Sequence, residues 1–77
     1  MSKLPVVDAQ TFEKVLLQLG FRVVRQKGSH VFYRHPDGRY TTLPHHKGKD
    51  IGKGLTRQIL REIDITPEEF VQLLKNK

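Results

Sequence analysis

The chain has 77 residues, a net charge of +6 and no cysteine. This length allows one small domain with a marginal core, and the absence of cysteine excludes a disulfide framework and any cysteine-ligated metal site. The net positive charge favours a polyanionic partner such as nucleic acid. The alternative interpretation is that the charged surface serves only to keep the protein soluble.

Neither a secretory signal nor a membrane span is visible in the sequence. The N-terminal residues lack an apolar segment, and no apolar run approaches the ~18 residues needed to cross a bilayer. We therefore expect a cytoplasmic protein with no membrane partner. We expect residues 1–77 to form a single domain, with a core over about 8–65 and a C-terminal helix over 66–75.

The first predicted element is a helix over residues 9–19. Asp8 is a good N-cap because its carboxylate can accept hydrogen bonds from first-turn amides, and Gly20 is a typical residue after a helix end. Four apolar residues recur at helical spacing and define one buried face: Phe12, Val15, Leu16 and Leu19.

Three strands are predicted next, over residues 21–26, 29–35 and 39–43, as an antiparallel meander. Lys27-Gly28 would close the first hairpin, because glycine takes the positive φ that a tight turn requires. Pro36-Asp37-Gly38 predicts the second turn, since proline fixes φ and glycine tolerates positive values.

Two-residue loops at both turns predict the register of the sheet. Four apolar residues then share the face that the helices cover: Phe21, Val23, Phe32 and Leu43. In this register His30 pairs with His45 and lies on the same face, at the end of the sheet beyond the helices. A shift of one residue would invert the assignment, because successive side chains point to opposite faces.

Residues 45–54 form a basic loop, followed by a second helix over about 55–63. The N-terminal end of this helix is a candidate phosphate site, because free backbone amides point out of it. Thr66-Pro67-Glu68-Glu69 is a capping box with proline at the first helical position. It predicts a third helix running to about residue 75.

His30 is the first candidate for chemistry. An imidazole titrates in the range needed for proton transfer during RNA cleavage, and Lys27 would stabilise the extra charge on the phosphorane. Ser29 would orient the turn or the phosphate rather than attack, because no partnered base is evident. The competing interpretation is that His30 is a structural or surface residue.

His45 and His46 form the second candidate cluster. One of them would face His30 and share the acid–base work, and the alternative is that they are exposed loop residues. A zinc site is disfavoured, because the four histidines have no regular ligand spacing and no cysteine assists them. No paired carboxylates stand out for a two-metal mechanism, so we expect neither a metal nor another cofactor.

Basic residues gather in the hairpin ends, in the loop after the third strand and at the start of the second helix. They predict a continuous phosphate-binding surface, against the alternative of a solvated face: Arg22, Arg25, Lys27, Arg34, Arg39, Lys47, Lys49, Lys53 and Arg57. Tyr33 and Tyr40 either stack on bases or pack within the sheet.

Five segments together resemble the HicA toxins, also called the YcfA family, of bacterial and archaeal toxin–antitoxin systems. The first three are Leu19-Gly20-Phe21, Arg25-Gln26-Lys27-Gly28-Ser29-His30 and His35-Pro36-Asp37-Gly38. The last two are Pro44-His45-His46 and Gly54-Leu55-Thr56-Arg57-Gln58-Ile59-Leu60. The resemblance covers about residues 8–70. It implies an α+β fold like a double-stranded-RNA-binding domain, with helices on one face of a three-stranded antiparallel sheet.

The resemblance also implies an mRNA interferase that cleaves RNA, blocks translation and is neutralised by a HicB-type antitoxin. The catalytic histidine of the family falls on His30, with Gly28 and Ser29 in its motif. The family pattern after the third strand selects His46, whereas the predicted register selects His45. A non-catalytic RNA-binding module of the same fold is the alternative. The C-terminal helix would cover the core, bind the antitoxin or mediate self-association.

Overall fold

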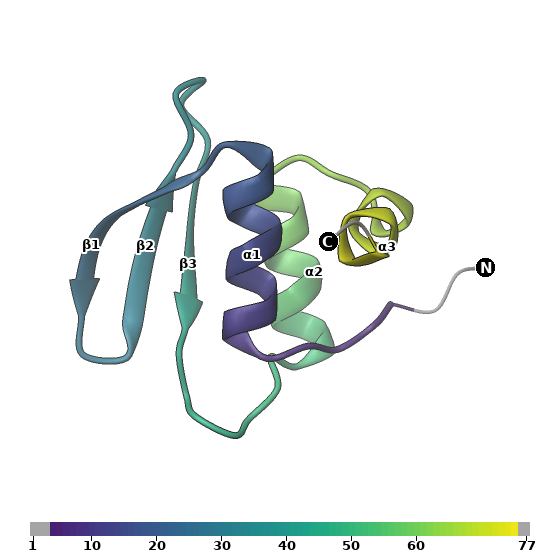
Figure 1. The fold of residues 1–77 in the computed structure, drawn as a ribbon, viewed down its shortest axis with the longest axis horizontal. Coiled ribbons are helices and arrows are strands. Elements are labelled where there is room, and N and C mark those ends of the chain that lie inside the picture. The colour runs from purple at the N-terminus through teal and green to yellow at the C-terminus, as the bar shows by residue number, and fades with distance from the viewer. Residues whose placement is uncertain (1–3, 76–77) are drawn as a thin grey trace.

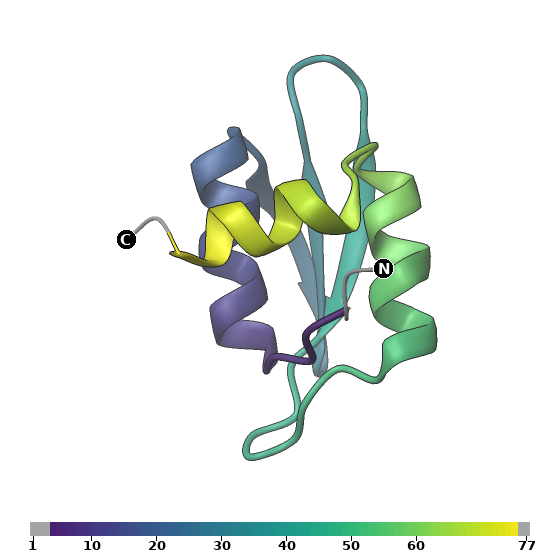
Figure 2. The ribbon, with the colours of Figure 1, turned by 90° about the vertical axis from the view of Figure 1, so that its right-hand side faces the viewer.

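The computed structural model describes residues 4–75, which fold into an α+β arrangement. The elements are α1 (Ala9–Leu19), β1 (Arg22–Lys27), β2 (His30–Arg34), β3 (Tyr40–Pro44), α2 (Lys53–Glu62) and α3 (Pro67–Lys75). The strands form one antiparallel sheet in the order β1-β2-β3. Both α1 and α2 lie on one face of this sheet (Figure 1). The third helix, α3, crosses α1 and α2 on their far side, away from the sheet (Figures 1 and 2).

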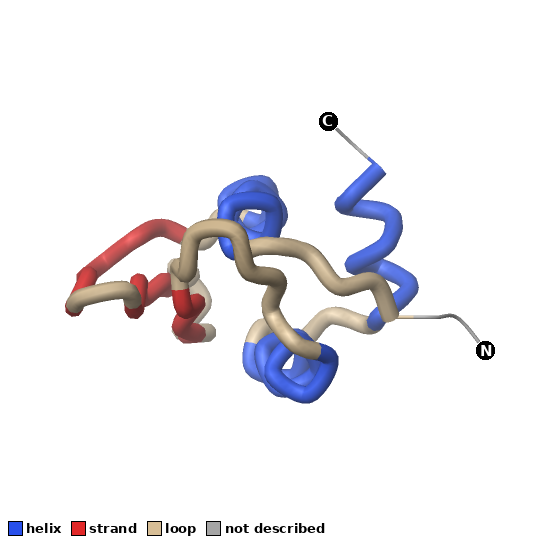
Figure 3. The backbone as a smooth tube through the Cα atoms, turned by 90° about the horizontal axis from the view of Figure 1, so that it is seen from below, coloured by secondary structure: helices blue, strands red, loops and turns tan. Residues whose placement is uncertain are grey.

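This arrangement confirms the predicted fold class, in which the order α-β-β-β-α is followed by a C-terminal helix. Seen from below, the sheet, the α1–α2 pair and α3 follow one another as layers (Figure 3). The core lies between these layers, and the rings of Phe12 and Phe70 pack with their centroids 4.8 Å apart. None of the helices within residues 4–75 is long and apolar enough to cross a membrane.

The helix ends follow the local signals in the sequence. The Asp8 carboxylate accepts a hydrogen bond from the Thr11 amide at 2.9 Å, and Gly20 closes α1 in the left-handed conformation. Thr66 and Glu69 form the reciprocal bonds of the predicted capping box, at 2.8 and 3.1 Å. The second helix begins two residues before its predicted start, because extended Gly52 is its N-cap.

The predicted register of the sheet is wrong at both turns. The first loop lies one residue later than predicted, which changes the partner of Arg25 from His30 to Phe32, and the pairing across the second turn is displaced by one residue. Gly28 and Ser29 form the first turn, so Lys27 pairs with His30. At the second turn the His35 amide donates to the Arg39 carbonyl at 2.8 Å, which leaves a loop of three residues instead of two. His30 therefore pairs with Pro44 and not with His45.

This shift changes which side chains the helices cover. The covered residues of β2 and β3 are Val31, Tyr33, Thr41 and Leu43. Phe21 and Leu43 are buried as predicted, whereas Phe32 is half-buried and lies with exposed His30 on the opposite face. Val23 is 49% exposed, and every other residue of the edge strand β1 is also exposed. A bulge also interrupts the pairing of β1 with β2 between Val23 and Arg25.

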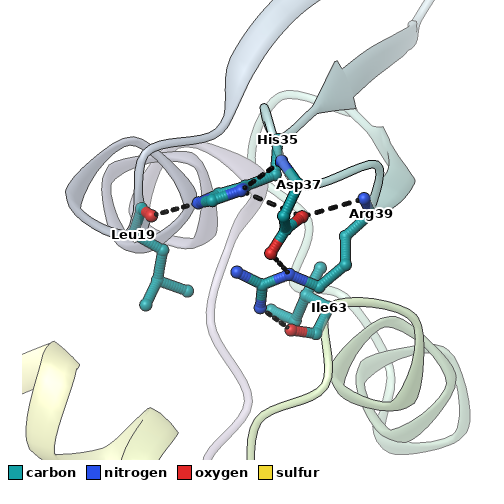
Figure 4. Close-up of polar contacts among 5 residues, drawn as sticks. All are labelled: Leu19, His35, Asp37, Arg39 and Ile63. Carbon is teal, nitrogen blue, oxygen red and sulfur yellow. Dashed lines mark hydrogen bonds and ion pairs between the residues drawn. The ribbon is translucent and has the colours of Figure 1, made fainter.

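The β2–β3 loop is fastened to the ends of α1 and α2 by a polar network (Figure 4). His35 Nε2–H donates to the Leu19 carbonyl at 2.9 Å, and His35 Nδ1 lies 2.9 Å from Asp37 Oδ1. The Arg39 guanidinium bonds Asp37 Oδ2 at 2.8 Å and the carbonyl of Ile63. His35 and Arg39 therefore have a structural role at the end of the sheet away from the first turn.

Replacing Asp37 with asparagine is expected to lower the melting temperature at neutral pH. The Arg39 backbone amide, the Arg39 guanidinium and the charge of His35 hold the pKa of Asp37 below its ordinary value of 3.8. A lowered carboxyl pKa stabilises the fold above the unfolded-state pKa, and this contribution is lost as the pH falls through the folded-state pKa. The difference from wild type should therefore vanish in acid.

Thermal unfolding from pH 7 to pH 2 measures this difference. The matched control is Asp50→Asn, because Asp50 is also exposed and lies outside the network of Figure 4. A melting-temperature difference for Asp37→Asn that is constant down to pH 2 would contradict the role given to the ionised carboxylate.

Candidate functional site

Four segments meet at one end of the molecule. The β1–β2 turn, the segment between β3 and α2, and the N-terminal ends of α1 and α2 all lie at the lower end in Figure 1, and the β2–β3 turn lies at the other. Because the meander reverses direction at each turn, residues near 28 and residues near 46 reach this same end. The fold thus gathers most of the residues that the sequence nominates.

The first turn brings Lys27 and His30 together. Gly28 has φ 60°, and Ser29 is not among the residues with positive φ, which is the pattern of a two-residue type II′ turn. Lys27 and His30 are the directly opposed pair that closes this turn. Directly opposed side chains share a face with their Cβ atoms about 5 Å apart, and both residues are exposed.

Ser29 joins this turn to the segment after β3. Its carbonyl accepts a hydrogen bond from the His45 amide at 2.7 Å. The side chain of Gln26 donates to the Gly28 carbonyl at 3.2 Å, which braces the turn from the other side. The backbone around His30 is therefore held by hydrogen bonds from two directions.

The His30 face of the sheet also carries a cation and two aromatic rings. Arg25 pairs with Phe32, and its guanidinium lies over that ring at 5.3 Å from the centroid. The centroids of Phe32 and Tyr40 are 6.1 Å apart. The two tyrosines thus have different roles, because Tyr40 is 46% exposed on this face whereas Tyr33 is fully buried under the helices.

His45 belongs to a cluster on the helix-covered face. The Tyr33 hydroxyl donates to Glu13 Oε2 at 2.5 Å, so its oxygen accepts from His45 Nε2–H at 2.8 Å. The same nitrogen lies 3.5 Å from Glu13 Oε2. Burial, the hydrogen bond to Glu13 and its charge all raise the pKa of the Tyr33 hydroxyl. This phenol therefore remains protonated at neutral pH.

His46 is placed differently from His45. It is exposed, and it lines a shallow hollow at the N-terminal end of α1. The hollow is bounded by Asp8, Ala9, Gln10, His45, His46, Lys47 and Gly48. His45 is held through Nε2 toward Tyr33 and Glu13, whereas His46 has an imidazole open to solvent. The choice of a second functional histidine between them stays a prediction.

Arg22 and Arg34 pair at the end of the hairpin away from the first turn, whereas four other nominated cations lie along the segment after β3 and the first turns of α2. All four are exposed: Lys47, Lys49, Lys53 and Arg57. The N-cap Gly52 supplies no side-chain hydrogen bond to the first turn of α2. Within residues 4–75, no three histidine, aspartate or glutamate side chains are grouped so that they could hold a metal ion. The nominated residues at this end supply imidazole, ammonium and guanidinium groups, and the Asp8 carboxylate lines the same hollow as His46.

Two features of the site were not found by sequence reasoning. Glu13 was not singled out, because only the position of α1 on the sheet brings it to Tyr33, which is 20 residues away in the chain. Phe32 was assigned to the core. The signal that could have placed it on the open face is that His30 and Arg34, its neighbours on the same side of β2, are both polar and exposed.

Comparison with known proteins identifies a family. A model described as "HicA toxin of bacterial toxin-antitoxin" matches residues 9–65, which is well over half of the chain. The matched segment runs from α1 through α2 and ends before α3 begins at Pro67. A search of curated proteins finds no match.

Proposed function

The chain belongs to the HicA toxin family of bacterial toxin–antitoxin systems, and from this premise we propose that it is a metal-independent endoribonuclease. The observation that carries the proposal is the exposed Lys27–His30 pair, which closes a braced turn at the end of the molecule where the other exposed cations gather. The substrate we propose is mRNA, whose cleavage would inhibit translation.

In this mechanism His30 moves the proton and Lys27 holds the phosphate. His30 takes the proton of the 2′-hydroxyl or gives one to the departing 5′-oxygen, since an imidazole serves either step near neutral pH. Lys27 faces the same phosphate and stabilises the charge that develops on its oxygens. Attack by the 2′-hydroxyl breaks the bond to the 5′-oxygen and leaves a cyclic phosphate.

Arg25, Lys47, Lys49, Lys53 and Arg57 are proposed to hold the RNA backbone, with Gly28 and Ser29 shaping the turn. His46 is the more accessible candidate for a second proton-transfer group, because His45 is engaged by Tyr33 and Glu13. We further propose a HicB-type antitoxin as the protein partner, whose acidic surface would compete with RNA for these cations.

The first experiment is incubation of the purified protein with single-stranded RNA in excess EDTA. Cleavage to products that end in a cyclic phosphate supports the proposal. Binding of RNA without cleavage would favour the alternative, a non-catalytic RNA-binding module with the same fold. Absence of both binding and cleavage would contradict both functions.

RNA binding is expected to weaken steeply with salt, and the double variant Lys49→Gln/Lys53→Gln should flatten that dependence. Each phosphate contact with a single strand adds about 0.7 to the slope of log K against log salt, because a condensed counterion is released. Loss of two contacts should therefore reduce the slope by about 1.4. Fluorescence anisotropy between about 50 mM and 300 mM salt measures this slope.

The control for this measurement is Lys75→Gln, which removes one exposed charge from α3, on the side of the molecule away from the sheet. Its slope should equal that of the wild type. A slope for the double variant that is also unchanged would show that the cations after β3 do not contact phosphate.

A further inference from the structure

The outer face of the sheet carries aromatic rings that no described element covers. All helices lie on the other side of the strands (Figures 1 and 3). Phe32 and Tyr40 lie on this open face with their centroids 6.1 Å apart and their planes tilted by 38°. Half-buried Phe32 and exposed Tyr40 thus form one apolar shelf on a chain whose core is completed elsewhere.

The shelf is surrounded by positive charge. Residues that share its face include Arg22, Arg25, Lys27, His30 and Arg34, as the strand pairing shows. None of the three strands contains an aspartate or a glutamate. The guanidinium of Arg25 already lies over the Phe32 ring. The face therefore combines π surfaces with cations, which is how proteins bind unpaired nucleic acid.

We propose that this open face is a stacking platform for single-stranded RNA, with a nucleobase on the Phe32–Tyr40 shelf and the flanking phosphates on the surrounding cations. The inference rests on the proposed function and specifies its substrate as unpaired RNA. His30 is two residues from Phe32 on the same strand, roughly 7 Å along it. A base on the shelf therefore places a neighbouring phosphate within reach of His30 and Lys27.

The shelf favours an unpaired strand over a duplex. The base faces of an A-form helix are covered by their neighbours, and proteins bind such a helix through phosphates and 2′-hydroxyl groups. A single strand can turn a base out and stack it on an aromatic ring. An acidic protein would use the cations of this face, whereas an unpaired strand uses both the cations and the flat ring surfaces of Phe32 and Tyr40, so RNA explains the combination that the face contains.

The first test compares oligonucleotides with equal numbers of phosphates on a His30→Ala background, which is expected to keep the RNA intact. A labelled single strand, the same strand with abasic sites, and a duplex of half the length are titrated by anisotropy at one salt concentration. The single strand is expected to bind roughly tenfold more tightly than its abasic form, because each stacked base contributes on that order. Equal affinity for all three oligonucleotides would overturn the stacking platform. The open face would then bind by charge alone, as it would bind an acidic protein partner.

The second test changes the rings. Tyr40→Leu and Phe32→Leu are each expected to lose roughly tenfold in affinity for the single strand, whereas Tyr40→Phe should retain it. Leu17→Ala is the matched control, since Leu17 is 49% exposed on α1, away from the open face. Unchanged affinity in Tyr40→Leu, which alters an exposed side chain and leaves the core intact, would overturn the proposal.

A direct readout comes from Tyr40→Trp, because the chain contains no tryptophan. Its fluorescence should be quenched by the single strand and not by the abasic strand. These binding measurements are independent of catalysis. If the wild type does not cleave RNA but Tyr40 still stacks on bases, the proposed enzyme fails and the platform stands. If the wild type cleaves RNA and Tyr40→Leu binds the single strand with unchanged affinity, the platform fails and the proposed enzyme stands.

Discussion

Replacing His30 with alanine is expected to lower the rate of RNA cleavage by about 10²–10⁴-fold, the usual contribution of a general acid or base. The imidazole is exposed at the closing pair of the first turn, beside Lys27. Its removal takes away the proton-transfer group but leaves the braced backbone and the surrounding cations in place. RNA affinity and the melting temperature should therefore stay close to those of the wild type.

Single-turnover cleavage of a labelled RNA in EDTA measures the rate, and anisotropy at the same salt measures binding. His46→Ala is the matched control for loss of an exposed histidine at this end of the molecule. If His46 is a second proton-transfer group, its variant should also slow cleavage, and if it is a bystander the rate should be unchanged. A His30→Ala protein that cleaves at the wild-type rate would remove His30 from the mechanism.

Replacing Phe70 with alanine is expected to destabilise the protein by about 3–5 kcal/mol, the usual cost of deleting a buried phenylalanine. Phe70 is fully buried on α3 and packs on Phe12 of α1. A domain of this size has a total stability of roughly 4–12 kcal/mol. The variant should therefore lose a large fraction of the total stability and unfold at a much lower urea concentration than the wild type.

This result would support our proposal that residues 1–77 form a single domain in which α3 completes the core. The family match ends at residue 65 and so does not include α3. Urea denaturation measures the loss, with Gln72→Ala as the control, because Gln72 is exposed on the same helix. A loss below about 1 kcal/mol for Phe70→Ala, which is far less than a core deletion costs, would show that α3 adds little to the domain.

The helices of this protein were largely determined by neighbouring residues in the sequence. Asp8, Gly20 and the Thr66–Glu69 capping box act over three or four positions, so their effects do not depend on the rest of the fold. The apolar spacing of Phe12 likewise marks the buried face of α1 correctly. The order of helices and strands, and hence the fold class, could be predicted for this reason.

The register of the sheet was decided by tertiary structure. The second turn has three loop residues instead of two, so the pairing of β2 with β3 moved by one residue and exchanged Phe32 for Tyr33 in the core. Both are aromatic residues of similar strand propensity, so the sequence does not distinguish them. A buried phenol requires hydrogen-bond partners. Tyr33 can be buried in this fold because its hydroxyl bonds Glu13 and His45.

The candidate site divides in the same way. The sequence by itself predicted that Lys27, Ser29 and His30 lie close together at one short turn, and the structure made Lys27 and His30 the pair that closes it. The sequence could not place His45 on the covered face or the Phe32–Tyr40 pair on the open face, because these positions depend on strand register and on the packing of α1 against the sheet. Contacts between distant residues form only when the layers assemble, and they determine which side chains remain exposed to a ligand.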